Sequence, residues 1–216
     1  MRIEPGSRVV FTGDSITDCG RGRPVGDNIH DTLGSGYVAF IDALVAVEYP
    51  DRDLRIFNTG VSGDTVRDLA YRWEQDVVAL KPDWLSVMIG INDVWRQFDT
   101  DPALLRPVLE PEYRDTLRRL LNGIRPSVRG IVVMLPFYLE AGPGDGMRAV
   151  RDRYAKLALE VARGVGAVVV DTQAAMEALL RWRGRDRLAP DGVHPTLVGH
   201  MVLASAWLRA VNGIGS

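Results

Sequence analysis

The chain has 216 residues, of which 46% are hydrophobic and 25% are charged, and its formal net charge is −2. This length suits one domain with a sizeable core. Because the charges are interspersed and nearly balanced, no nucleic-acid or anionic-membrane partner is expected. Cys19 is the single cysteine, which excludes an intramolecular disulfide.

The first residues, 1–6, contain no apolar segment typical of a signal peptide, and no apolar run approaches the ~20 residues that span a bilayer. A cytoplasmic location is therefore expected. No motif in the chain requires a cofactor or a metal ion, so we expect neither.

Apolar runs and segments of helical periodicity alternate along the chain. The expected strands are residues 9–11, 54–58, 83–89, 130–135 and 167–171, and the expected helices are residues 37–49, 65–80, 112–124, 147–163, 172–182 and 196–211. Prolines interrupt residues 94–110, which are expected to be irregular or partly helical. This alternation indicates the α/β class: a single domain over residues 1–216, built as a three-layer α/β/α sandwich on a five-stranded parallel sheet.

A polar turn, Gly13-Asp14-Ser15, follows the first expected strand. In an open α/β sheet, ligands bind at the carboxyl ends of the strands, so Ser15 lies where a hydrolase would carry its nucleophile. A serine after Gly-Asp is also common as a turn or cap residue. We interpret Asp14 as a carboxylate that stabilises the turn.

Other polar segments are expected near this turn. Gly63 and Asn92 each follow an expected strand within a few residues, so they fall at the same edge of the sheet. Residues 191–195, with the sequence DGVHP, form a polar loop before the last helix. Four segments that are distant in sequence are thus predicted to converge on one crevice.

The residue types in this crevice suit acyl transfer. A serine hydroxyl needs a base to remove its proton, and the base needs an orienting group. We expect His194 to be the base and Asp191 the orienting acid, since they are three positions apart on one loop. The backbone N–H groups of Ser15 and Gly63 and the side-chain amide of Asn92 are candidate donors to the oxyanion. Taken singly, Gly63 also fits a turn glycine and Asn92 a helix cap, so the combination carries the prediction.

Of the other two histidines, His30 lies in the glycine-rich loop that follows residue 19, and His200 lies inside the last expected helix with no acid at comparable local spacing. His30 and His200 are therefore expected to be surface or structural residues.

Taken in order, these motifs resemble those of the SGNH (GDSL-type) serine hydrolases over the whole chain. The similar segments are residues 13–15 (GDS, the nucleophile block), 58–65 (the second block), 90–93 (GIND) and 191–195 (DGVHP, the acid and base block). The resemblance implies a flavodoxin-like SGNH-hydrolase fold, a triad of Ser15, Asp191 and His194, and an oxyanion hole of Ser15, Gly63 and Asn92.

A narrower resemblance concerns the substrate. Residues 12–21, 90–96 and 171–175 are similar to the intracellular bacterial acetylxylan esterases of this superfamily. This implies a serine esterase that forms an acyl-enzyme and removes acetyl groups from xylo-oligosaccharides or related small saccharides. Trp95 is expected at the rim of the crevice, where it would stack on a sugar ring. Tyr37 and Tyr138 are further candidates, although aromatic residues pack in cores at least as often.

Three alternatives stay open. The first is the same catalysis on a short-chain aryl ester or a thioester. The second is a carbohydrate-binding protein without catalysis, and the third is a metal-dependent phosphatase with Asp14, Asp18 and Asp64 as oxygen ligands. A homo-oligomer is also expected, because the resembling intracellular enzymes are often oligomers, with apolar positions in residues 94–110 or around Trp182 as candidate interface.

Overall fold

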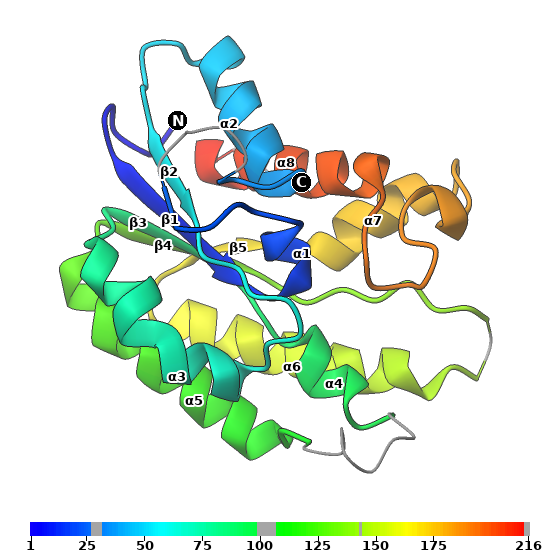
Figure 1. Ribbon diagram of the computed structural model, residues 1–216. Coiled ribbons are helices and arrows are strands. Elements are labelled where there is room, and N and C mark those ends of the chain that lie inside the picture. The colour runs from blue at the N-terminus through cyan, green and yellow to red at the C-terminus, as the bar shows by residue number, and fades with distance from the viewer. Residues whose placement is uncertain (27–31, 99–106, 143, 214–216) are drawn as a thin grey trace.

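The computed structural model describes residues 1–26, 32–98, 107–142 and 144–213. Its centre is a five-stranded sheet in the order β2-β1-β3-β4-β5, in which all neighbouring strands are parallel (Figure 1). The strands are β1 (Arg8–Gly13), β2 (Arg55–Asn58), β3 (Trp84–Met88), β4 (Gly130–Met134) and β5 (Val168–Val170). The five-stranded parallel sheet expected from the sequence is confirmed.

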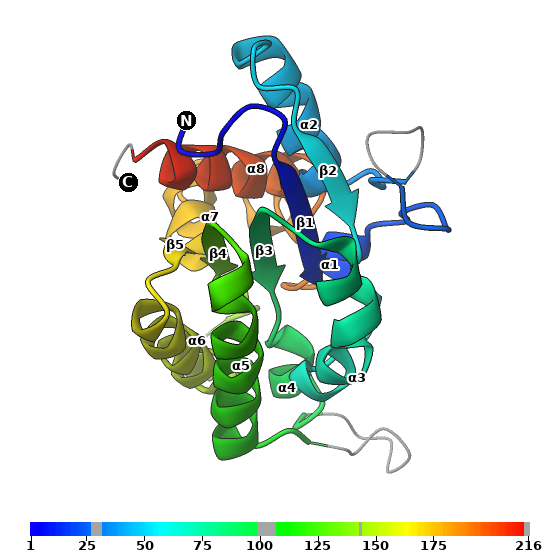
Figure 2. The same cartoon turned by 90° about the vertical axis from the view of Figure 1, so that its left-hand side faces the viewer.

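Helices cover both faces of the sheet (Figure 1 and Figure 2). One face carries α2 (Tyr37–Glu48), α7 (Thr172–Leu180) and α8 (Leu197–Asn212), and the other carries α3 (Val66–Asp76), α5 (Glu110–Ile124) and α6 (Gly146–Gly164). Two short helices, α1 (Ser15–Asp18) and α4 (Ile91–Trp95), follow the carboxyl ends of β1 and β3. The three-layer α/β/α arrangement is therefore also confirmed. None of the described helices is long and apolar enough to cross a bilayer.

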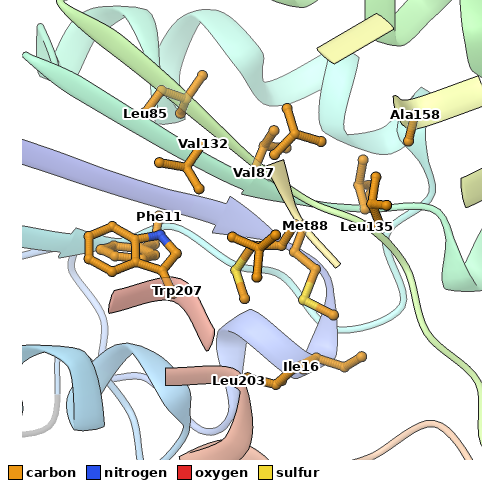
Figure 3. Packing of buried hydrophobic residues seen from close by; sticks show 14 of the residues in the cluster. Phe11, Ile16, Leu85, Val87, Met88, Val132, Leu135, Ala158, Leu203 and Trp207 are labelled. Atoms are coloured by element: carbon orange, nitrogen blue, oxygen red, sulfur yellow. The ribbon is translucent and has the colours of Figure 1, made fainter. Parts of the chain in front are cut away.

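The central strands are apolar on both sides because helices bury both faces of the sheet. Every residue of β3 and β4 is buried. Trp207 of α8 lies over Phe11 of β1, with ring centroids 5.3 Å apart (Figure 3). The indole Nε1 of Trp207 donates to the Ser86 hydroxyl at 3.0 Å, so its one polar atom is satisfied inside the core. Burial of each such side chain contributes about 1.5–3 kcal/mol to folding.

Two helices differ from the sequence prediction. The helix expected over residues 65–80 ends at Asp76 in the structure and is followed by a 3₁₀ turn, Val78–Leu80. Helix α4 begins before the irregular segment expected at residues 94–110, because Gly90, at φ 128°, turns the chain directly from β3 into a helix. Residues 99–106 of that segment lie outside the described residues.

The strand order fixes where a ligand can bind. After β1 the chain moves to β2 on one side and then crosses to β3 on the other side. This reversal opens a crevice at the carboxyl ends of β1 and β3, which is where open α/β sheets bind their ligands. The helices α1 and α4 begin at this edge, so their first residues line the crevice.

Candidate active site

The crevice brings together three residues from the two ends of the chain. Ser15 is the first residue of α1, and its Oγ lies 2.9 Å from Nε2 of His194. On the other side of the ring, Nδ1 of His194 lies 2.6 Å from Oδ2 of Asp191. Because the carboxylate accepts from Nδ1, that nitrogen carries the proton and the lone pair of Nε2 faces the serine hydroxyl. This is the geometry of a nucleophile, a base and an orienting acid.

Asp191 also holds its own loop. Its Oδ1 accepts from the backbone N–H groups of Val193, at 2.9 Å, and His194, at 2.8 Å. Burial raises the pKa of the Asp191 carboxyl, but the hydrogen bonds from the His194 side chain and from these two backbone groups outweigh it and keep that pKa below its ordinary value. The carboxylate therefore stays charged and accepting while it orients the ring.

The loop that carries Asp191 and His194 is supported from β4. The backbone N–H of Leu139, beyond the end of that strand, donates to the carbonyl oxygen of Gly192 at 2.9 Å. Gly192 has a φ of 87°, and a Cβ at this position would lie 2.5 Å from the carbonyl oxygen of Leu139. Only glycine fits this close approach without strain.

Asp14 stabilises the turn between β1 and α1, as predicted. Its Oδ1 accepts from the backbone N–H of Ile16 at 3.0 Å, which caps the helix that begins with Ser15. Burial raises the pKa of the Asp14 carboxyl to about 7, against the hydrogen bond from Ile16 and the nearby His194 ring.

The three candidate oxyanion donors lie on segments that meet at this edge of the sheet. As the first residue of α1, Ser15 has a backbone N–H without an acceptor inside the helix. Gly63 has a φ of 86°, and among the described residues a Cβ there would have only the Nη2 atom of Arg96 within 4 Å, at 3.6 Å. The Asn92 amide Nδ2 donates to the carbonyl oxygen of Asp64 at 2.9 Å, and an amide nitrogen carries a second N–H.

The loop that carries Gly63 is bonded to the nucleophile helix. The Asn58 amide donates to the carbonyl oxygen of Thr17 at 2.6 Å. Asp18 Oδ2 accepts from both the backbone N–H and the hydroxyl of Ser62, at 3.1 and 2.8 Å. Asp18 is thus a structural anchor that sequence reasoning missed, because its partner is 44 positions away.

Of the aromatic residues proposed to bind sugar, Trp95 fits that role. Its ring lies beside the His194 ring, with centroids 5.8 Å apart, and it is partly exposed. Tyr37 does not fit: it is 0% exposed, and its hydroxyl shares a hydrogen bond with the Thr17 hydroxyl at 3.0 Å. The prediction that Tyr37 stacks on substrate is wrong, because the side chain lies beneath α1 with no face open to a ligand.

Tyr138 also requires a correction. It is 8% exposed, and its hydroxyl donates to Oδ2 of Asp145 at 2.6 Å. Its ring packs closely against Gly192. Tyr138 therefore supports the loop of Asp191 and His194 and leaves little ring surface for a sugar.

His200 is structural, as predicted. Its Nδ1 accepts from the backbone N–H of Tyr37 at 3.1 Å, and its Nε2 lies 3.3 Å from the Cys19 sulfur. Burial lowers the pKa of His200 to about 4, so the ring is neutral at physiological pH. His30 lies outside the described residues.

The aspartates of the phosphatase alternative each have a different partner. Asp14 caps α1, Asp18 binds Ser62, and Asp64 pairs with Arg72. In the part of the chain that the structure describes, no three His, Cys, Asp or Glu side chains are grouped as metal ligands would be.

The model of the GDSL-like Lipase/Acylhydrolase family matches residues 11–202. The chain belongs to this family. The match includes every residue of the crevice described above, and it confirms the resemblance to SGNH (GDSL-type) hydrolases. This GDSL-like protein is accordingly a carboxylic ester hydrolase.

Individual members of the family are similar over nearly the whole chain. The acetylxylan esterase of Geobacillus stearothermophilus is 47% identical over 211 residues, which cover 98% of this chain and 96% of that protein. The crystal structure of this esterase, Axe2, superposes with a TM-score of 0.93, also with 98% and 96% coverage. LAE5, an alpha/beta hydrolase enzyme from the metagenome of Lake Arreo in Spain, is 44% identical with a TM-score of 0.94 and full coverage of both chains. Three further structures are of catalytic mutants of Axe2, S15A, D191A and H194A.

Proposed function

We propose that this GDSL-like hydrolase is a serine esterase that removes acetyl groups from acetylated xylo-oligosaccharides. The observation that carries the proposal is the hydrogen-bonded chain of Ser15, His194 and Asp191 at the carboxyl edge of the sheet. The similarity to an acetylxylan esterase whose S15A, D191A and H194A variants are described as catalytic mutants supports both the residues and the substrate class.

The reaction follows from the geometry. Ser15 Oγ attacks the acetyl carbonyl carbon while His194 Nε2 takes the hydroxyl proton, and Asp191 stabilises the imidazolium that forms. The N–H groups of Ser15 and Gly63 and the amide of Asn92 donate to the developing oxyanion. His194 then returns its proton to the leaving sugar oxygen, which leaves an acetylated Ser15. Water, deprotonated by His194, hydrolyses this intermediate to acetate and free enzyme.

The sugar part of the substrate is assigned to the rim of the crevice. Trp95 lies beside His194 and is partly exposed, so its ring offers an apolar face next to the base that protonates the leaving sugar oxygen. A pyranose ring stacked there would keep its acetylated hydroxyl within reach of Ser15.

Release of acetate from acetylated xylo-oligosaccharides tests the proposal, with a chelator present throughout. The native protein and Ser127→Ala, a matched exposed serine in the 3₁₀ turn Arg125–Ser127, should release acetate at equal rates, and Ser15→Ala should release none. If the native protein hydrolysed an aryl acetate but not the acetylated xylo-oligosaccharides, the result would support the triad and contradict the proposed substrate. Sugar binding without any turnover would favour the carbohydrate-binding alternative, and loss of native activity on chelation would favour a metal-dependent reaction.

The predicted homo-oligomer is part of this proposal. Trp182 and Leu197 are each 70% exposed, and they flank an apolar groove of about 650 Å³ between α2, α7 and α8. Protruding side chains beside a groove on one face allow two copies to fill each other's grooves about a two-fold axis. Light scattering should show an oligomer for the native protein and a smaller species for Trp182→Glu. The cytoplasmic location also stays a prediction, which cell fractionation tests.

A further inference from the structure

We infer that Arg72 is a positioning residue that fixes the oxyanion donors relative to the nucleophile. It does so by joining the nucleophile turn (residues 13–15) to the oxyanion loop (residues 59–65). The inference rests on the proposed esterase function, and it concerns a residue of α3 that touches neither Ser15 nor His194 in any described contact.

The guanidinium group of Arg72 binds both segments at once. Its Nη2 donates to the carbonyl oxygen of Gly13 at 2.8 Å, two residues before Ser15. Its Nη1 donates to the carbonyl oxygen of Thr59 at 2.6 Å, and its Nε to Oδ2 of Asp64 at 2.5 Å. The same side chain also reaches the Thr12 hydroxyl and Oδ2 of Asp76, at 3.3 and 3.0 Å. The side chain is only 13% exposed, so these bonds are largely shielded from water.

The contact between Arg72 and Asp64 affects the positions of two of the three proposed oxyanion donors. Asp64 follows Gly63 directly, and its carbonyl oxygen accepts the hydrogen bond that orients the amide of Asn92. A shift of Asp64 would therefore move Gly63 and Asn92 together. Because Arg72 also holds Gly13, it sets both donors relative to the turn that carries Ser15. Misplacement by about 1 Å in a catalytic site can cost about a hundredfold in rate.

Only arginine fits this role. The guanidinium is a rigid plane with five N–H donors, whereas a lysine ammonium is a point charge with three. Three acceptors on the two segments are bonded here by three different nitrogens of one plane. Burial raises the pKa of Asp64, and the ion pair with Arg72 opposes that rise. Removal of the arginine would thus free the loop and favour the neutral form of the carboxyl that it binds.

Arg67 provides a matched control on the same helix. It makes a two-nitrogen ion pair with Glu112, with both distances 2.7 Å, but it is 48% exposed and has no described bond to either segment of the site. Arg67→Ala removes the same charge and the same side chain from α3 without loosening the oxyanion loop.

The experiment compares the native protein, Arg72→Ala, Arg72→Lys and Arg67→Ala on an aryl acetate, with kcat, KM and Tm measured for each. We expect Arg72→Ala to lower kcat by about a hundredfold with KM changed less than threefold. Arg72→Lys should restore only part of that loss, and Arg67→Ala should match the native kcat. Guanidinium ion, far below unfolding concentrations, should raise the kcat of Arg72→Ala and leave Arg67→Ala unchanged.

The outcomes separate this inference from the function on which it rests. A folded Arg72→Ala with kcat within threefold of the native value would overturn the inference, as would a kcat loss that guanidinium does not relieve. If Arg72→Ala does not fold, a native kcat in Arg72→Lys would overturn it, and a reduced kcat at unchanged KM would support it. A native protein without esterase activity, or an active Ser15→Ala, would overturn the proposed function itself.

Discussion

The side-chain amide of Asn92 donates to the backbone carbonyl oxygen of Asp64 at 2.9 Å, so a residue that follows β3 is oriented by the loop that follows β2. One N–H of the amide is used in this bond, and the other remains to point at an oxyanion. The donor is fixed before substrate arrives, which is the condition under which such hydrogen bonds stabilise a transition state most.

Replacement of Asn92 by alanine should therefore lower kcat by about 10²–10³-fold with the fold retained. Asn122→Ala, at an exposed position of α5, is the matched control and should leave kcat unchanged. Steady-state kinetics on an aryl acetate measures both. A loss of less than tenfold in Asn92→Ala would show that its amide does not bind the oxyanion.

Gly192→Ala should reduce both stability and activity. The φ of 87° is unfavourable for alanine, and the new methyl group would meet the Leu139 carbonyl oxygen at 2.5 Å. The backbone must move, and with it the loop of Asp191 and His194, at a cost of about 1–3 kcal/mol in the free energy of unfolding. Gly184→Ala is the control, because no atom of the residues that the structure describes lies within 4 Å of its added methyl group, apart from its own chain neighbours. Urea unfolding of the two variants measures the difference, and equal midpoints would contradict the prediction.

Stability should fall in acid because of His200. Burial lowers its pKa to about 4 in the folded state, from an ordinary value of 6.5. Between these values the unfolded chain takes up a proton that the folded protein does not, so the free energy of unfolding decreases as the pH falls from about 6.5 to 4. The full effect amounts to about 3 kcal/mol. His200→Asn should flatten this part of the curve, measured by urea unfolding across that range. If the free energy of unfolding of His200→Asn depended on pH as that of the native protein does, the acid sensitivity would arise from other groups.

Asp93 should lower the free energy of unfolding as the pH rises, which is opposite to the effect of His200. Its carboxyl is fully buried, and it accepts from the Val66 N–H at the start of α3. Burial raises its pKa to about 8 from an ordinary value of 3.8, so the folded protein holds a proton that the unfolded chain has lost between those values. Stability from this group is present at low pH and is lost as the pH rises towards 8. Asp93→Asn keeps an acceptor for the Val66 N–H. The difference between its free energy of unfolding and that of the native protein should be more favourable to the variant at pH 8 than at pH 5. No relative gain in urea unfolding would contradict this assignment.

Local patterns in the sequence predicted most of the fold and the contact between Asp191 and His194 in the site. Asp191 and His194 are three residues apart, so their contact follows from local geometry. Ser15 was placed by the strand that precedes it, because the carboxyl ends of parallel strands share one edge. The amphipathic periodicity of the longer helices has the same local origin.

Contacts between distant segments were not predictable in this way. Tyr37 begins a helix with ordinary periodicity, and no pattern shows that its ring is buried beneath α1. The bond from Arg72 to the Gly13 carbonyl oxygen spans 59 positions, and an arginine on a helix surface carries no signal of such a partner. Helix α4 is only five residues long, too short for a period to be visible.

That short helix has a consequence for how the activity can diverge. Asn92 and Trp95 are three positions apart on α4, hence one helical turn, so the group assigned to the reacting carbonyl and the group assigned to the sugar form one rigid unit. A substitution that tilts α4 to admit a bulkier alcohol would also tilt the amide away from the oxyanion. New substrates are therefore more easily acquired through changes on the walls facing this helix than on the helix itself.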